Sequence, residues 1–479
     1  MSSSRLEVLK QPATTSQRWR RTLGGALFRL RARARLGARH GAVALLTLSL
    51  GVACGDAPAR SESPTPRVVL ITLDTLRADA LLDENPSMPK LAARAQQGLN
   101  FTDFWSACTT TQPAHASLFT GLHPWEHGVH ANGLVLADDA LTVAEIFQLA
   151  GWRTEAVVAS FPLEKRFGFT QGFDAYDDEF LVTLKGEWAG EDVDNDRFYT
   201  LAPTILERAG AVVERTAGEP LFLWTHAFDP HAPYGDLAGK PELHLRALFK
   251  AARNAPSEMP ATLARARALY NADARALDDA LDVFLDTLLD DPDHETHVVI
   301  TADHGESFGE DMSFGHGRRV SRVQLQVPCI VLSSKVSAAV RDDTAGSVDI
   351  PHTLLELAEL ANPLRTNGRS LLSRGSGGEL QAVGMRQTFP PGHGDPQIDG
   401  TELSIEGPNF FVVREGRLHG GDANSVKSEG EPLPEAAQAS LRERFATWTK
   451  LVEAGAAQGL NDPETMEAMK QLGYVGEDG

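Results

Sequence analysis

Continuous apolar runs that alternate with helical patterns constrain the fold of this chain more than any other feature. The run VVLITL at 68–73 is rich in β-branched residues, as expected of a parallel strand buried on both faces. Strands separated by helices predict a doubly wound α/β fold with a parallel sheet, whose ligands bind at the carboxyl ends of the strands. The other predicted strands span 154–160, 221–227, 297–302 and 328–333, and the predicted helices span 89–97, 142–151 and 262–290.

The composition excludes several classes of protein. Of the 479 residues, 42% are hydrophobic and 23% are charged, which is ordinary for a folded chain and excludes disorder throughout. No apolar run reaches the ~20 residues of a membrane-spanning helix, so a polytopic membrane protein is excluded. Three cysteines cannot build a disulfide framework. The formal net charge of −20 argues against nucleic acid as a partner, because phosphate binding depends on neutralisation by Lys and Arg.

Residues 1–54 have the pattern of an export signal. They hold 10 Lys/Arg and 1 Asp/Glu, and a short apolar stretch at 42–53 ends directly before Cys54. The small residues before this cysteine resemble the lipobox of bacterial lipoproteins; an ordinary secretory signal and an uncleaved anchor helix are alternatives. We therefore expect an exported protein, a periplasmic or cell-envelope lipoprotein anchored to the membrane by an N-terminal lipid, with 55–66 as its linker.

The organisation of the chain changes near residue 372. A Gly/Ser-rich segment, SRGSGGE, follows there, and the apolar runs become sparser. A strand at 410–413 and a helix at 435–453 are expected beyond it. We therefore predict a catalytic domain over 67–371 and a smaller α+β C-terminal subdomain with a tail over 372–479.

Polar residues with catalytic chemistry follow the predicted strands. Asp74 follows the strand at 68–73, and Asp303 and His304 follow the strand at 297–302. His226 and Asp229 lie at the end of the strand at 221–227, with His231 shortly after. Because the carboxyl ends of parallel strands meet at one edge of a sheet, we expect these residues to form one site.

The segment CTTTQPAHASLFTG at 108–121 places a threonine at a helix start. Pro113 suits the first turn of a helix, and Gly121 suits its end. Thr111 then lies where backbone N–H groups and the helix dipole favour an anion. A structural N-cap and a nucleophile activated by a metal are the two interpretations of this threonine.

Four motifs in this order resemble the sulfatase family within the alkaline-phosphatase superfamily. They are LDTLRAD at 73–79, TQPAHASLFTG at 111–121, FDPHAPY at 228–234, and TADHGESFGE with GHG over 301–317. The resemblance implies an alkaline-phosphatase/sulfatase-like α/β sandwich with a smaller C-terminal subdomain. It also implies a metal-activated nucleophile that attacks sulfate or phosphate esters.

The resemblance also assigns roles to individual residues. Asp74, Asp303 and His304 match metal ligands of the family, and Thr111 falls at the position of the nucleophile, which also contacts the metal. His231 matches the histidine that touches the ester oxygens. His316 matches a later basic residue that contacts the same group or its leaving oxygen.

Departures from the family pattern bear on the reaction. Sulfatases carry Cys or Ser at the nucleophile position, which is oxidised to formylglycine, and threonine cannot undergo this maturation. His115 replaces the arginine of the motif, and Thr75 replaces the second aspartate of the first motif. The pattern is closer to members with a threonine nucleophile, which include phosphodiesterases and phosphoethanolamine transferases. These departures favour a phosphate ester over a sulfate ester.

The expected cofactor is a divalent metal ion. A histidine among the ligands favours zinc or manganese, with calcium as the alternative. A second ion bound by Asp229, His231 or His316 is one interpretation of those residues, and direct contact with the substrate is the other. The expected substrate is a small-molecule, glycan or lipid ester. Besides a hydrolase, a phosphoryl-group transferase and a non-catalytic surface binding lipoprotein fit the sequence.

Overall fold

The computed structural model describes residues 64–373 apart from short gaps, and four strands between 382 and 428. The gaps are residues 184–185, 189–190, 194–196, 238–239, 311–312 and 318–320. The fold below is that of the unit formed by Pro64–Asp138 and Thr142–Gly479. The predicted export signal and the helix expected at 435–453 lie outside the described residues.

The centre of this unit is an eight-stranded sheet in the order β15-β2-β14-β11-β1-β10-β4-β5. Its middle strand β1 pairs in parallel with both β10 and β11. The apolar runs form strands here because helices cover both faces, so every residue from Val68 to Leu73 is buried. In sheet order, the bounds are β15 (Ala339–Arg341), β2 (Leu99–Phe101), β14 (Cys329–Leu332), β11 (His294–Ala302), β1 (Thr65–Leu73), β10 (Leu221–Ala227), β4 (Arg153–Val157) and β5 (Ala175–Asp177).

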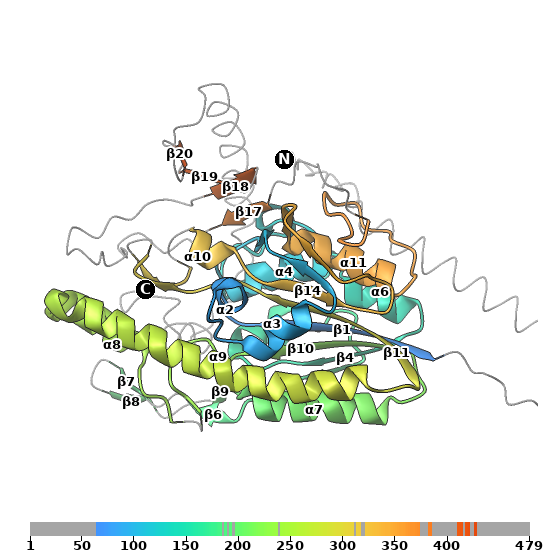
Figure 1. The fold of residues 1–479 in the computed structure, drawn as a ribbon, viewed down its shortest axis with the longest axis horizontal. Helices are drawn as coiled ribbons and strands as arrows, with labels where there is room; N and C mark the ends of the chain where they lie inside the picture. Colours follow the sequence, from blue (N-terminus) through green and yellow to red (C-terminus); the bar gives the residue numbers. More distant parts are fainter. Residues whose placement is uncertain are drawn as a thin grey trace, which may run out of the picture. The chain divides into compact units, whose positions relative to one another are not determined.

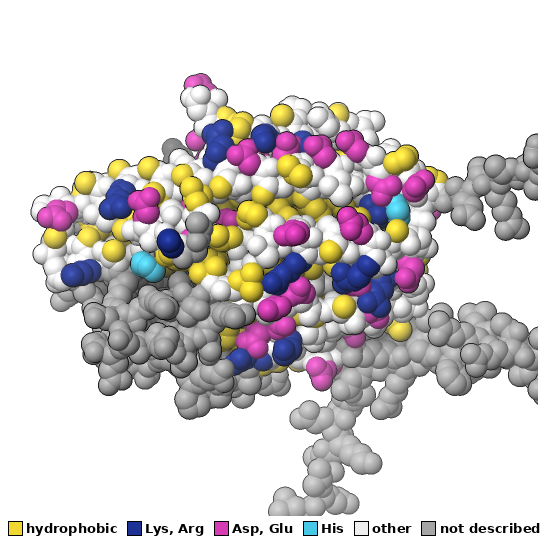
Figure 2. Space-filling model, turned by 90° about the horizontal axis from the view of Figure 1, so that it is seen from below, with side chains coloured by type: hydrophobic (Ala, Val, Ile, Leu, Met, Phe, Trp, Pro, Cys, Tyr) yellow, Lys and Arg dark blue, Asp and Glu magenta, His cyan; other side chains and the backbone are white. Residues whose placement is uncertain are grey.

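Helices form a layer on each face of the sheet (Figure 1). One layer consists of α3 (Pro89–Ala95), α7 (Ala202–Arg215) and α9 (Met259–Leu289). The other consists of α4 (Thr111–Thr120), α6 (Val143–Leu149) and α11 (Ile350–Leu357). The predicted α/β sandwich and its strands are therefore confirmed. The face of the molecule shown in Figure 2 mixes acidic and basic side chains. Ion pairs join Arg94 to Asp282 and Lys90 to Asp279.

The sheet is mainly parallel, as predicted, but it contains one strand of opposite direction, β14. β14 runs antiparallel to both β11 and β2. A parallel return would need a crossover connection, usually a helix. In its described part, the connection from β11 to β14 contains only the short helix α10 (Arg322–Leu325) and the hairpin of β12 (Ser307–Phe308) and β13 (Phe314–Gly315). The chain therefore returns in the opposite direction, through a segment that carries site residues.

The smaller elements complete the described structure. β18 (Phe410–Arg414) includes the strand predicted at 410–413 and belongs to a four-stranded antiparallel sheet. Among the helices that the structure describes, none has both the length and the apolar character needed to cross a bilayer. The remaining elements are α2 (Asp79–Leu82), α5 (Pro124–His127), α8 (Leu245–Asn254), η1 (Phe161–Leu163), η2 (Lys165–Phe167), η3 (Pro256–Glu258), η4 (Ser347–Asp349), β3 (Phe104–Trp105), β6 (Val182–Thr183), β7 (Gly186–Trp188), β8 (Glu191–Val193), β9 (Arg197–Tyr199), β16 (Ala345–Gly346), β17 (Ala382–Met385), β19 (Arg417–Gly421) and β20 (Val426–Ser428).

Gly305 is required by close packing beside the site, and Gly305→Ala is expected to destabilise the protein. A β-carbon at this position would overlap the carbonyl oxygen of Val323, which belongs to the backbone and cannot rotate away. Overpacking of this kind costs about 1–3 kcal/mol, so the melting temperature should fall. Gly210→Ala in α7 is the control, since a β-carbon there meets nothing within 4 Å and alanine favours the helix. Equal melting temperatures for the two variants would contradict this account.

Candidate metal centre and nucleophile

The strand register brings the residues after β1 and β11 side by side. Leu73, the last residue of β1, pairs with Ala302, the last residue of β11. Asp74 and Asp303 are therefore neighbours at the carboxyl edge of the sheet. The N–H of Asp74 donates to the carbonyl of Ala227 at 2.9 Å, which continues the pairing with β10 by one residue.

Asp303 is held by one carboxylate oxygen and presents the other. Its Oδ1 accepts hydrogen bonds from the N–H groups of Thr75 at 3.1 Å and His304 at 2.8 Å. Its Oδ2 is buried and has no hydrogen-bond partner. This division fixes the carboxylate through the backbone and leaves one oxygen available to a ligand.

The Nε2 atom of His304 lies close to the carboxylates of Asp303 and Asp74. Its Nδ1 lies 3.1 Å from the carbonyl oxygen of Gly305, which can only accept, so Nδ1 carries the proton. Nε2 therefore carries the lone pair. It lies 3.5 Å from Asp303 Oδ2 and 3.9 Å from Asp74 Oδ1. A histidine whose other nitrogen donates to a backbone carbonyl is the usual form of a metal-binding imidazole.

The three side chains fit a divalent metal ion. Both oxygens of Asp74, Oδ2 of Asp303 and Nε2 of His304 are buried without hydrogen-bond partners. Buried polar atoms are normally satisfied, so four such atoms around one space indicate a missing ligand. One ligand atom from each residue lies within 4.8 Å of the others, which suits coordination. A donor set of carboxylate oxygens and imidazole nitrogen fits zinc or manganese.

Electrostatics favour a cation at this place. Burial raises the pKa of Asp74 well above its ordinary value, and the charges of Asp303 and Glu306 raise it further. Burial likewise raises the pKa of Asp303 to about 6, partly opposed by His115. Two carboxylates in one buried space repel each other, and a bound cation removes that cost.

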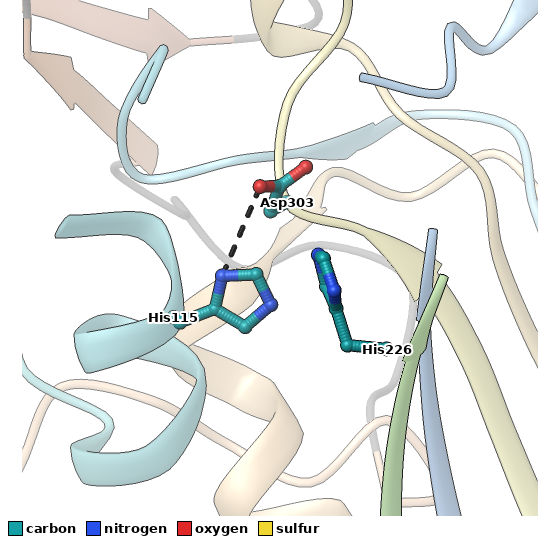
Figure 3. Close-up of side chains that lie close together, drawn as sticks. All are labelled: His115, His226 and Asp303. Atoms are coloured by element: carbon teal, nitrogen blue, oxygen red, sulfur yellow. Dashed lines mark ion pairs between the residues drawn. The ribbon is translucent and has the colours of Figure 1, made fainter. Parts of the chain in front are cut away.

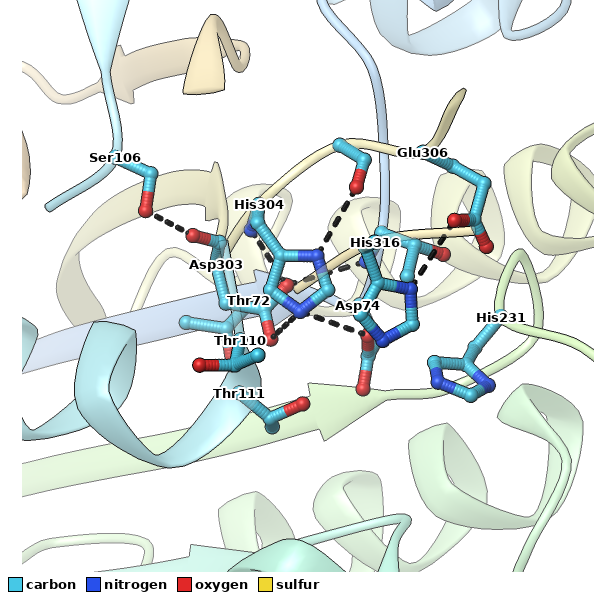
Figure 4. A network of polar contacts seen from close by, with 12 residues as sticks. Thr72, Asp74, Ser106, Thr110, Thr111, His231, Asp303, His304, Glu306 and His316 are labelled. Carbon is cyan, nitrogen blue, oxygen red and sulfur yellow. Dashed lines mark hydrogen bonds and ion pairs between the residues drawn. The ribbon is translucent and has the colours of Figure 1, made fainter. Parts of the chain in front are cut away.

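Thr111 begins α4, as the position of Pro113 predicts. The N-cap is Thr110, whose side chain makes no capping hydrogen bond, and Gly121 ends the helix with φ 69°. The interpretation of Thr111 as a structural N-cap is therefore wrong, because the cap lies one residue earlier. In Figure 4 the hydroxyl of Thr111 is directed to the side where Asp74 lies, whereas that of Thr110 points the other way.

The start of α4 offers fewer backbone donors than expected. The N–H of Gln112 donates to Oδ1 of Asn132 at 2.9 Å, and Pro113 has no N–H. The helix start therefore contributes less to anion binding than its position predicts.

His231 and His316 lie beside the metal ligands (Figure 4). The ring centroids are 4.9 Å apart for His231 and His316, and 4.4 Å apart for His304 and His316. Burial and, to a smaller extent, the nearby His316 lower the pKa of His231 to about 3, so His231 is a neutral group. The structure thus brings together all six residues that the resemblance assigns to the site.

Glu306 orients His316. Oε1 of Glu306 lies 3.1 Å from His316 Nδ1, and Oε2 accepts from the hydroxyl of Tyr234 at 2.9 Å. Burial raises the pKa of Glu306 to about 7, and the hydrogen bond from Tyr234 opposes this rise. In its carboxylate form, Glu306 holds the proton of His316 on Nδ1 and leaves the lone pair on Nε2.

Asp229 has a structural role. Its carboxylate accepts the N–H of Ala202 at 2.7 Å, at the start of α7. The interpretation of this residue as a ligand of a second ion is therefore not supported by its contacts.

Two histidines near Asp303 were given no clear role by the sequence. His115 comes from α4, and His226 comes from β10 (Figure 3). With Asp303 they form a second group whose ligand atoms lie within 4.8 Å of one another. The register places His226 opposite Thr72 on β1, one residue before the strand ends. This position near the end of the strand is the reason why the sequence predicts His226 in the site, whereas its partners there are seen only in the structure.

Comparisons with known proteins find a matching family and several relatives. The family model for Sulfatase matches residues 66–360. The chain is 30% identical over 280 residues to an ulvan-active sulfatase of Formosa agariphila, covering 52% of each protein. It is 23% identical over 324 residues to the uncharacterized sulfatase YidJ of Escherichia coli, covering 58% of this chain and 64% of that protein. The matches thus span about half to two thirds of the length of these relatives.

Solved structures share the fold. A phosphonate monoester hydrolase from Silicibacter pomeroyi superposes with a TM-score of 0.58 at 21% identity, covering 83% of this chain and 96% of that chain. A 2-O GAG sulfatase superposes with a TM-score of 0.58 at 16% identity, covering 84% of this chain and 96% of that chain. The architecture is therefore common to proteins described as acting on different esters.

Proposed function

Since the chain belongs to the sulfatase family, we propose that it is a metal-dependent hydrolase that cleaves a phosphate or sulfate ester with Thr111 as the nucleophile. One observation supports this most strongly. Asp74, Asp303 and His304 present buried ligand atoms without partners at the sheet edge, beside the start of the helix that carries Thr111. A binding protein without catalysis has no need of unsatisfied ligand atoms next to a positioned hydroxyl.

The residues support a reaction in two steps. In the first, Thr111 Oγ bonds to the phosphorus or sulfur atom while the bond from that atom to the alcohol oxygen breaks. His316 Nε2 takes the hydroxyl proton and returns it to the leaving oxygen. In the second, His316 takes a proton from water, the water oxygen bonds to the same atom, and the bond to Thr111 breaks. The proton then returns to Thr111 Oγ, which restores the enzyme.

A bound divalent ion would lower the pKa of the hydroxyl and offset the charge that develops on the ester oxygens. Asp74, Asp303 and His304 would hold it. His231, which is neutral and buried, would position the ester by hydrogen bonding.

Phosphate esters fit this mechanism better than sulfate esters. Formylglycine releases sulfate by collapse to an aldehyde, and the ester of a threonine has no such route. Displacement by water of a phosphothreonine-type intermediate is a reasonable alternative, because phosphoryl transfer depends mainly on positioning and charge stabilisation. Both a sulfatase and a phosphonate monoester hydrolase are among the similar proteins. A small-molecule, glycan or lipid ester remains the proposed type of substrate.

A substrate panel tests the proposed function. Turnover of p-nitrophenyl phosphate, bis-p-nitrophenyl phosphate, p-nitrophenyl phenylphosphonate and p-nitrophenyl sulfate is compared after loading with zinc, manganese or calcium. We expect zinc or manganese to support the highest kcat/KM, with a phosphorus ester preferred over the sulfate. No turnover of any ester with any of the metals would contradict the proposal, and the addition of alcohols would reveal a transferase. Export and lipid attachment at Cys54 stay predictions from the sequence.

A further inference from the structure

We propose that His226 and His115 are positioning residues that hold Asp74 and Thr111 by hydrogen bonds, and that neither is a metal ligand. This inference rests on the proposed metal centre and nucleophile. Their proximity to Asp303 makes these histidines resemble a second metal site (Figure 3). The partners of each ring nitrogen assign them a different role.

The hydrogen bonds of His226 determine which nitrogen carries its proton. The backbone N–H of Ala159 points at Nδ1 from 3.4 Å, and an N–H can only donate, so Nδ1 carries the lone pair. The proton of the neutral imidazole is therefore on Nε2. Burial, with smaller effects from neighbouring histidines, lowers the pKa of His226 well below its ordinary value, which agrees with a neutral ring.

The protonated nitrogen of His226 faces a metal ligand. Nε2 lies 3.4 Å from Oδ2 of Asp74, and neither atom has another hydrogen-bond partner. A small rotation of either side chain would complete an Nε2–H···Oδ2 hydrogen bond. Asp74 would then be held through Oδ2 and would present Oδ1, the oxygen nearer to His304, to the metal. A nitrogen that carries a proton cannot bind a metal ion.

Both nitrogens of His115 already have partners. Nδ1 lies 2.8 Å from the carbonyl oxygen of Thr111, which only accepts, so this nitrogen carries the proton. Nε2 lies 3.1 Å from Thr72 Oγ1, which also accepts the indole N–H of Trp224 at 3.0 Å. Because that indole is a donor only, the threonine hydroxyl donates to Nε2. The chain of bonds from Trp224 through Thr72 and His115 thus ends on the backbone of the nucleophile.

His304 differs from His226 and His115 in the state of its Nε2 atom. Its Nδ1 donates to a carbonyl and its Nε2 lone pair faces the carboxylates. Among the three buried histidines around Asp303, the partners of both ring nitrogens therefore separate one ligand from two supports. His226 has an N–H partner at Nδ1, so its Nε2 is a donor. His115 and His304 both have a carbonyl partner at Nδ1, but Nε2 of His115 is bonded to Thr72, whereas Nε2 of His304 has no hydrogen-bond partner and can bind a metal.

Cobalt binding to the apoprotein tests this assignment. Affinity is measured by titration and coordination by the visible absorption of the bound Co²⁺. His226→Leu should bind Co²⁺ about 10–100-fold more weakly, as expected when a partner that orients a ligand is removed. His226→Gln should stay close to the wild type in affinity and spectrum, because its amide N–H lies near the place of Nε2. His115→Gln should also leave the spectrum unchanged, and His304→Gln should lose tight binding.

The outcomes separate this inference from the proposed function. If the wild type and all variants fail to bind Co²⁺, the metal centre and this inference are both wrong. If His304→Gln loses the ion but His226→Leu binds it as well as the wild type, only the role of His226 is wrong. If His226→Gln or His115→Gln changes the spectrum and loses affinity as His304→Gln does, that histidine is a ligand. Circular dichroism confirms that each variant is folded.

Discussion

Replacing Thr111 by alanine is expected to reduce kcat by more than about 10³-fold, because loss of a covalent nucleophile costs more than the 10²–10³ of one lost charge-stabilising donor. Thr111→Ser should keep most of the activity. The hydroxyl remains, and the lost methyl group is worth about 1 kcal/mol, or roughly fivefold. Steady-state kinetics on the best substrate of the panel provides the measurement.

Thr110→Ala is the matched control for this comparison. Thr110 is also buried, but its hydroxyl contacts the sulfur of Cys108 at 3.4 Å, and Figure 4 shows it directed away from Thr111. Its removal should leave kcat largely unchanged. If Thr110→Ala and Thr111→Ala lose the same activity, a general disturbance of the helix start explains the loss. Undiminished turnover in Thr111→Ala would show that the nucleophile lies elsewhere.

Asp303→Asn is expected to abolish both activity and tight metal binding while preserving the fold. The amide oxygen can still accept the N–H groups of Thr75 and His304, so the buried backbone stays satisfied. The charged ligand atom Oδ2 is lost. Metal affinity should fall by more than about 100-fold, beyond the 10–100-fold typical of residues that only orient ligands.

The loss of metal binding in Asp303→Asn can be measured without an activity assay, from the effect of zinc on the melting temperature. A metal that binds only the native state raises the melting temperature by mass action, and Asp303→Asn should remove that rise. Asp229→Asn is the matched control, because Asp229 is also a carboxylate that follows a strand but accepts the N–H of Ala202. The melting temperature of Asp229→Asn should therefore still rise when zinc is added. A full rise in Asp303→Asn would show that the metal binds elsewhere.

The part of the site that depends on strand ends could be predicted from the sequence. Burial on both faces produces continuous apolar runs, so β1 and β11 were recognisable, and with them the places of Asp74 and Asp303. The start of α4 followed from Pro113 and its end from Gly121. These features are local, and each depends on a few neighbouring residues.

Features that depend on tertiary contacts could not be predicted in this way. The direction of β14 depends on how the chain returns from β11, which no local pattern records. The roles of Asp229 and His226 depend on which backbone groups approach them from α7 and from the segment after β4. Asp229 and His226 lie close together along the chain, near the end of β10. Asp229 nevertheless binds the start of a helix, whereas His226 faces the proposed metal ligand Asp74.

The central claim, covalent catalysis by Thr111, is tested most directly by intact-protein mass spectrometry after rapid quenching of the metal-loaded enzyme with substrate. The account predicts an adduct with the mass of the transferred phosphoryl or sulfuryl group, mapped by peptide fragmentation to Thr111 and absent from Thr111→Ala. If quenched enzyme carries no adduct during turnover, even when the second step is slowed, or if the adduct maps to another residue, the claim is contradicted.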